Sequence, residues 1–257
     1  MKLELAPSTS KRTHANLRNE VLLVLGVSLG QSAIYALVSI TARLTADRPL
    51  SQQTATLNAS QSARPYLDLT YQLLGIFFDL VPVVLAIHLL NRERDARATL
   101  GLDARRPFFD ITSGTILATV IGVPGLLLYF GAHELGVNAT VVPAALPDLW
   151  WAVPILILAA AQNAILEEVV VVGYLMTRLE DMGWRVRSII AASALLRGSY
   201  HLYQGFGGFV GNAVMGVIFA YFYLRTRRVL PLVIAHTLLD VVAFIGYTLL
   251  KDRVSWL

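Results

Sequence analysis

The feature that most constrains this chain is a series of seven apolar runs separated by polar segments. The runs cover residues 21–42, 67–90, 109–132, 149–176, 188–204, 209–224 and 229–250. A helix needs about 20 mostly apolar residues to cross the hydrocarbon core of a bilayer. Only 15% of the residues are charged, against about 25% in soluble domains. The pattern predicts an all-α, polytopic transmembrane bundle of about seven spans, with an eighth, re-entrant or interfacial element as the alternative.

The basic residues predict how this bundle is oriented. Fifteen of them fall in the segments on the side of the N-terminus, and five fall in the segments on the other side. The positive-inside rule therefore places the N-terminus in the cytoplasm and the C-terminus outside. We expect a multi-pass protein of a plasma membrane, such as the bacterial inner membrane. The net charge of +4 is attributed to this topology and not to a nucleic-acid partner.

The runs divide the chain into four parts. Residues 1–20 are predicted to be a cytoplasmic tail, 21–148 three spans with their loops, 149–250 a core of four spans, and 251–257 a C-terminal tail. The polar segment Thr45–Pro65 is expected to be an outward loop. The absence of cysteine excludes disulfides and thiol catalysis.

Glu167 and Glu168 are adjacent carboxylates inside an apolar run. A charged side chain near the bilayer centre costs at least about 2.5–3.5 kcal/mol, so it requires a partner or a function. Three more ionisable residues lie in later runs: His201, His236 and Asp240. At about 1.5 Å per helical residue, these groups lie roughly 9–18 Å from the cytoplasmic ends of their runs. We therefore expect one buried site near the middle of the membrane.

The spacing of polar residues supports a shared site. Polar residues recur four positions apart, on one helix face, in three of the runs: Asn163 with Glu167, Arg197 with His201, and His236 with Asp240. Glu168 should be turned by about 100° from Glu167.

These side chains suit hydrolysis of an amide bond. In a low-dielectric cavity, a carboxylate can act as general base on a water molecule, and a histidine can orient that water or protonate the leaving amine. His236 and Asp240 could direct donors toward the oxyanion, with Asp240 in the protonated form that burial favours. The residue types would also allow a divalent ion such as zinc, held by Glu167, His201 and His236.

Three segments resemble the motifs of the CPBP intramembrane proteases, which include the type II CAAX prenyl endopeptidases and the Abi bacteriocin self-immunity proteins. The family pattern is EExxxR, commonly followed by Gly-Tyr-Leu, then FxxxH, and then HxxxN or HxxxD. Here residues 167–175 are EEVVVVGYL, residues 196–201 are LRGSYH, and residues 236–240 are HTLLD. The resemblance covers about residues 150–245 and keeps the family's order of motifs on separate runs.

The resemblance implies a membrane-embedded endopeptidase. Glu167 would activate water with help from His201, His236 and Asp240 would stabilise the oxyanion, and Glu168 would orient the site. It also implies a glutamate mechanism without a metal, although the family was long described as metalloproteases, so we expect no cofactor. The substrate would be a membrane-bound or lipidated protein or peptide, reached from the cytoplasm or laterally from lipid.

Two positions depart from the family pattern. Val172 stands where the motif has arginine, and Arg197 stands where it has phenylalanine. We hypothesise that Arg197 supplies the missing guanidinium from the neighbouring helix and pairs with Glu168. The alternative is a degenerate active site.

Three polar residues are assigned supporting roles beside Arg197: Asn163, Asn212 and Asp79. Asn212 is more often a residue that joins helices than a catalytic group. Asp79 either forms a structural hydrogen bond or lines the edge of the site, where it could touch Arg197.

Two other functions fit the same residues. A proton-coupled transporter could use the acids and histidines as a relay, but no inverted repeat is evident between the two halves of the chain. A membrane scaffold with a protease fold, working as a partner subunit, would explain the loss of the motif arginine at Val172.

Overall fold

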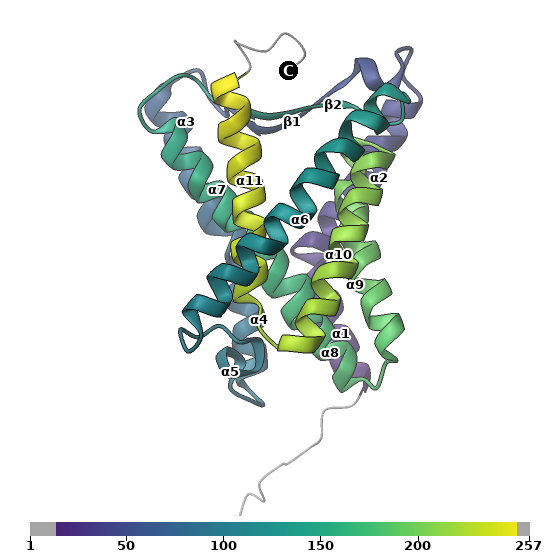
Figure 1. Cartoon of the computed structure of the whole chain (residues 1–257), viewed down its shortest axis with the longest axis vertical. Helices are drawn as coiled ribbons and strands as arrows, with labels where there is room; N and C mark the ends of the chain where they lie inside the picture. Colours follow the sequence, from purple (N-terminus) through teal and green to yellow (C-terminus); the bar gives the residue numbers. More distant parts are fainter. Residues whose placement is uncertain (1–13, 251–257) are drawn as a thin grey trace, which may run out of the picture.

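The computed structural model describes residues 14–250, and they form a bundle of long helices (Figure 1). Within this described part, five segments are long and apolar enough to cross a membrane: Pro65–Asn91, Pro107–Glu134, Ala152–Asp181, Phe206–Thr226 and Leu230–Leu249. A sixth candidate is the pair α1 (His14–Gly26) and α2 (Leu29–Leu44), which is bent by 56°. Large apolar side chains such as Phe77, Leu127 and Val242 are exposed on the outside of the bundle, as a lipid-facing surface requires. The predicted all-α polytopic membrane protein is confirmed.

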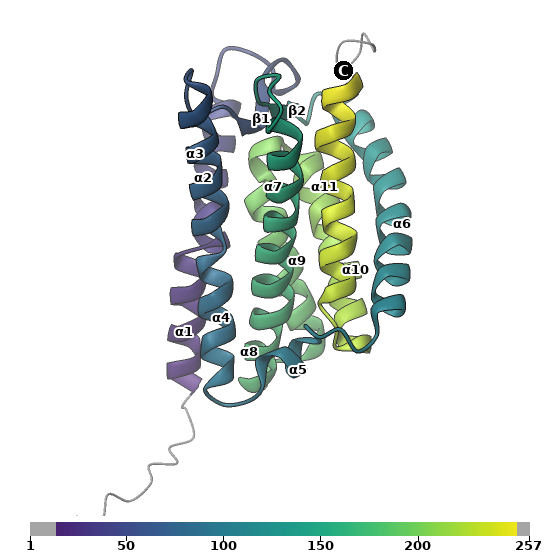
Figure 2. The same ribbon diagram turned by 90° about the vertical axis from the view of Figure 1, so that its left-hand side faces the viewer.

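The helices after α2 form these segments and the connections between them. They are the helices α3 (Pro65–Asp79), α4 (Val81–Asn91), α5 (Ala96–Leu100), α6 (Pro107–Glu134), α7 (Ala152–Glu167), α8 (Leu175–Asp181), α9 (Val186–His201), α10 (Phe206–Thr226) and α11 (Leu230–Leu250), with a π-helix at Glu168–Tyr174 and 3₁₀ turns at Leu50–Gln52 and Leu202–Gln204. Figure 2 shows α7 between α3 and α11. The predicted N-terminal tail is helical from His14 onward, and its residues 1–13, like the C-terminal tail 251–257, lie outside the described residues.

The predicted run 188–204 is the one that falls short of a full span. It forms α9, which has 16 residues, and a 3₁₀ turn. At 1.5 Å per residue, α9 is about 24 Å long, less than the hydrocarbon thickness of about 30 Å. It lies close to α10, where a Cβ added to Gly216 would lie 2.9 Å from the Cα of Ala194. The number of seven spans and the orientation of the bundle stay predictions.

The segment Pro65–Asn91 is broken in its middle. The helix α3 ends at Asp79, and α4 begins at Val81 with Pro82 in its first turn. Proline has no N–H and cannot complete the hydrogen-bond ladder of a continuous helix. The break places the carboxylate of Asp79 at the end of α3, in the interior of a candidate span.

A short parallel sheet, which the sequence did not predict, lies at the end of the bundle near the C-terminus of α11 (Figure 1). It pairs β1 (Thr54–Ala59) with β2 (Thr140–Ala145), in the register Thr54 opposite Thr140. The Asn58 side chain donates to the carbonyl oxygen of Pro143 at 2.8 Å. The expected outward loop Thr45–Pro65 therefore contains an ordered strand.

The opposite end of the bundle is held by two buried arginines. Arg178 contacts the carboxylates of Glu20, Glu93 and Asp181. Arg228 forms two hydrogen bonds of 2.7 Å to Asp110 and one of 3.0 Å to Asp103. The backbone N–H of Arg105 lowers the pKa of Asp103, with help from the Arg228 guanidinium. These ion pairs tie the loops to the helix ends and fix the relative positions of the helices that carry the site.

Candidate active site

The two adjacent carboxylates lie where α7 passes into a π-helix. Glu167 is the last residue of α7, and Glu168 is the first residue of the π-helix, whose seven residues are all buried. π-Helical turns are rare and frequently occur at functional sites. Both carboxylates find partners on α9 and α11, although a regular helix would turn them about 100° apart. They share partners because α9 and α11 both place polar side chains against this turn.

Arg197 of α9 pairs with Glu168. Its Nη2 atom donates to Glu168 Oε1 at 2.6 Å, and both side chains are fully buried. The guanidinium also lies over the ring of Phe219, 5.3 Å from its centroid. A Cβ at Gly216 would lie 3.3 Å from Arg197 Cδ, so the glycine leaves room for the arginine stem. The predicted pairing of Arg197 with Glu168 is confirmed; its functional role stays a prediction.

His236 of α11 completes the surroundings of Glu168. Its Nδ1 atom lies 2.7 Å from Glu168 Oε1, the same oxygen that accepts from Arg197. Its Nε2 atom lies 3.7 Å from Asp240 Oδ1, one turn further along α11. Glu168 therefore holds Arg197 and His236 in place from two different helices.

Glu167 lies at the convergence of three groups from α9. The hydroxyl of Tyr200 donates to Glu167 Oε2 at 2.7 Å. His201 Nε2 and Arg197 Nη1 lie 3.7 Å and 3.6 Å from the same oxygen. These two nitrogens have no hydrogen-bond partner among the residues that the structure describes, so they keep donor or acceptor capacity beside Glu167.

The sequence analysis assigned no role to Tyr200, although this residue lies next to His201 in the second motif. A signal was present, because the hydroxyl of a tyrosine within an apolar run needs a partner unless it lies at the membrane interface. The sequence does not show which carboxylate the hydroxyl reaches, since that depends on how α9 is rotated against α7.

The supporting residues do not all join this site. Asn163 lies one turn before Glu167 on α7 and within interaction range of Asp240. Asp79 lines a pocket together with Asn163, and no contact between Asp79 and Arg197 is found among the described residues. The amide of Asn212 donates at 3.0 Å to the carbonyl oxygen of Gly208 in its own helix. This hydrogen bond of Asn212 therefore lies within α10.

The residues that are close enough together to hold a metal ion differ from those expected from the sequence. One ligand atom each of Glu167, Glu168 and His236 lies within 4.8 Å of the others, whereas the sequence pointed to His201 in place of Glu168. Arg197 and His236 already contact Glu168 Oε1 at 2.6 Å and 2.7 Å. A divalent cation bound there would have to displace or approach a guanidinium, which opposes its binding. The geometry therefore fits a metal poorly.

The fold and site define a polytopic membrane protein with a buried centre of two glutamates, an arginine and histidines, contributed by three helices. Residues 149–242 match the family described as type II CAAX prenyl endopeptidase Rce1-like. The matched segment includes all five predicted catalytic residues and supports the resemblance to CAAX proteases that the sequence motifs indicated. Comparisons with curated proteins and with solved structures found no match.

Proposed function

We propose that the protein is a glutamate-dependent intramembrane endopeptidase. The observation that carries this proposal is the convergence of Tyr200, His201 and Arg197 on one oxygen of Glu167. Glu167 would take a proton from a water molecule while the water oxygen attacks the carbonyl carbon of a peptide bond. The proton would then pass to the leaving nitrogen as the C–N bond breaks, with His201 as the group that relays it.

The second carboxylate has a different role in this proposal. Glu168 is neutralised by Arg197 and contacts His236 at 2.7 Å, so it orients the histidine and does not act on water. His236 and a protonated Asp240 would donate toward the oxyanion of the tetrahedral intermediate. Loss of one such donor typically costs about 10²–10³ in rate.

The proposed reaction needs no metal, because Arg197 already supplies the positive charge between the carboxylates. We expect cleavage by the purified protein to continue unchanged in the presence of EDTA or 1,10-phenanthroline. The measurement is the rate of fragment release after dialysis against each chelator. Loss of activity that returns when zinc is added would contradict this expectation.

The substrates we propose are membrane-bound or lipidated proteins, which would reach a site within the bundle from the cytoplasm or laterally from the lipid. We place the protein in a plasma membrane with the N-terminus inside, on the strength of the basic residues. A stable membrane-protein partner and any nucleic acid are not needed for this reaction.

The proposed function is tested by profiling membranes from cells that carry the wild-type protein or Glu167→Gln. New protein N-termini should appear only with the wild-type protein, because Gln cannot accept the proton of the attacking water. Glu180→Gln is the matched control: Glu180 lies in the same candidate span as Glu167 but pairs with Arg227 at the end of α10 and with no residue of the site, and the variant should give the wild-type fragments. Identical fragments in all three membranes would refute the proposal.

A further inference from the structure

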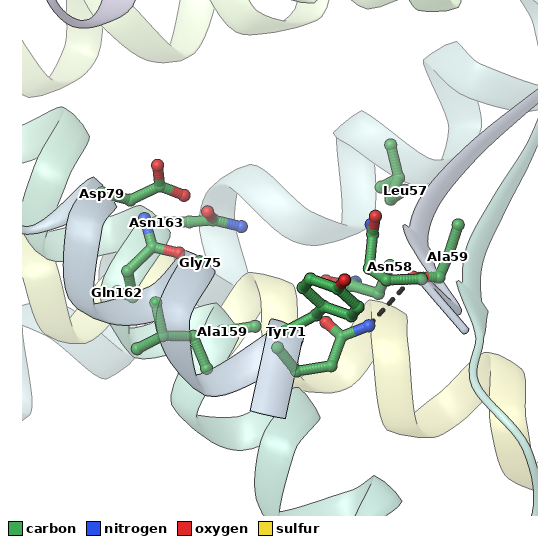
Figure 3. Close-up of a pocket in the computed structure, with 12 residues that line it drawn as sticks. Leu57, Asn58, Ala59, Tyr71, Gly75, Asp79, Ala159, Gln162 and Asn163 are labelled. Atoms are coloured by element: carbon green, nitrogen blue, oxygen red, sulfur yellow. Dashed lines mark hydrogen bonds between the residues drawn. The ribbon is translucent and has the colours of Figure 1, made fainter. Parts of the chain in front are cut away.

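A polar pocket lies between β1, α3 and α7, on the side of Asn163 away from Glu167. Its volume is about 360 Å³, room for roughly ten water molecules. Figure 3 shows Asp79, Gln162 and Asn163 together at one end of the pocket and Asn58 of β1 at the other. Such a volume of polar-lined space within a bundle is suited to a ligand and not to packing.

A buried carboxylate holds together the segments that form the wall of the pocket. Asp68 of α3 is fully buried, and it accepts hydrogen bonds from the Ser60 hydroxyl at 2.9 Å and from the Gln61 backbone N–H at 2.7 Å. The Gln72 amide donates to Asp68 and, at 3.0 Å, to the carbonyl oxygen of Ala59. These bonds hold β1 against α3, so the pocket has a defined shape.

The chemistry of the lining favours a cation. Among the described residues that line the pocket, Asp79 is the charged one. The amide nitrogens of Asn58 and Gln72 are used in bonds to backbone carbonyls, which leaves their oxygens as acceptors. Gln162 is 5% exposed, and its Nε2 atom has no hydrogen-bond partner in the described part of the chain. A ligand that brings both a cation and a carbonyl oxygen would satisfy all of these groups.

Asn163 lies at the boundary between the pocket and the candidate active site. This residue lines the pocket and lies within interaction range of Asp240. It precedes Glu167 by one turn, about 6 Å along the helix axis. One or two residues of an extended peptide cover that distance. A peptide held in the pocket can therefore place a neighbouring peptide bond beside Glu167.

We propose that this pocket is a substrate subsite for a peptide segment with a lysine or arginine, whose cation pairs with Asp79 while its backbone carbonyl accepts from Gln162. The inference rests on the proposed endopeptidase function and names a feature of its substrate. An isolated carboxylate in the interior of a span is costly, and pairing with a substrate cation offsets that cost.

The test measures binding in Glu167→Gln protein in nanodiscs, where cleavage is abolished. The probes are two fluorescent, N-dodecanoylated decapeptide amides that differ only at one central residue, lysine or norleucine. We expect the lysine peptide to bind at least about fivefold more tightly, and we expect Asp79→Asn to remove this difference. Asp148→Asn, which changes an exposed aspartate in the loop before α7, should preserve it. Equal binding of the two peptides, or a preference that survives Asp79→Asn, would overturn the proposal.

A crosslinker separates this subsite from other occupants. With p-benzoylphenylalanine at Ala159, which lines the pocket, the lysine peptide should be captured. The same group at Leu158, which is exposed on the outside of α7, should capture lipid. Capture of a phospholipid in place of the peptide at position 159 would overturn the proposal. If the lysine peptide is bound and captured but the wild-type protein cleaves nothing, the endopeptidase function is refuted and the proposed binding site for the peptide still stands.

Discussion

Purified protein with Glu167→Gln is expected to cleave its substrate at least about 100-fold more slowly than the wild type, since a positioned general base contributes about 10²–10⁴ in rate. The fold should be retained. Glutamine has the shape of glutamate, and its side-chain oxygen can still accept the hydrogen bond that Tyr200 donates to Glu167 at 2.7 Å. The measurement is a time course of fragment release in detergent or liposomes, together with the thermal unfolding midpoint of each variant.

The control for this variant is again Glu180→Gln, which should keep both the rate and the unfolding midpoint. A Glu167→Gln protein that is folded and cleaves at the wild-type rate would contradict the role of Glu167. Liposome flux that is lost with Glu167, in a protein that shows no cleavage, would favour the proton-coupled transporter instead.

Replacement of Arg197 by methionine is expected to have the largest effect on stability. Methionine keeps an unbranched apolar stem but leaves the fully buried Glu168 without its guanidinium partner. Breaking a buried ion pair from one side typically costs about 3–5 kcal/mol, and the contact with Phe219 is lost as well. The free energy of unfolding should fall accordingly, and activity should be lost because His236 loses its fixed support. Arg225→Met, at an exposed arginine that donates to Tyr221 in its own helix, should change the stability little.

The double variant Val172→Arg with Arg197→Phe moves the arginine from α9 to the π-helix. It tests whether the guanidinium that pairs with Glu168 can come from either helix. Val172 is fully buried in the π-helix, four residues after Glu168, so an arginine there would approach the same carboxylate and restore the family pattern. We expect the double variant to fold and to retain activity, unlike either single variant. A well-folded, inactive double variant would contradict this exchange and favour a scaffold that has lost catalysis.

Much of the site could be predicted because helical periodicity is regular. Arg197 and His201 are four residues apart, and both lie near Glu167 Oε2 in the structure. His236 and Asp240 share a face of α11 in the same way. The cost of burying an unpaired charge explains why Glu168 and Arg197, which are 29 residues apart, find each other.

Other features could not be predicted, because they depend on contacts between distant elements. The pairing of β1 with β2 joins two six-residue segments that are far apart in the chain, and neither carries a strong strand pattern. Tyr200 and Gln162 gained their roles from the rotation of α9 and α7. The bond from the amide nitrogen of Asn212 to the Gly208 carbonyl oxygen within α10 likewise depends on the side-chain conformation.

The sequence by itself determined that this protein is a membrane helix bundle with buried ionisable residues, because the bilayer demands long apolar helices and charges within them demand partners. The sequence also predicted that Arg197 pairs with Glu168. Only the tertiary structure decided the other partners: it directed Tyr200 to Glu167, placed His236 on the same Glu168 oxygen that Arg197 contacts, and left Asp79 in a pocket, where no contact with Arg197 is found among the described residues. Side-chain pairing across a bundle depends on helix rotation and depth to within a few ångströms, and periodicity within one helix does not contain that information.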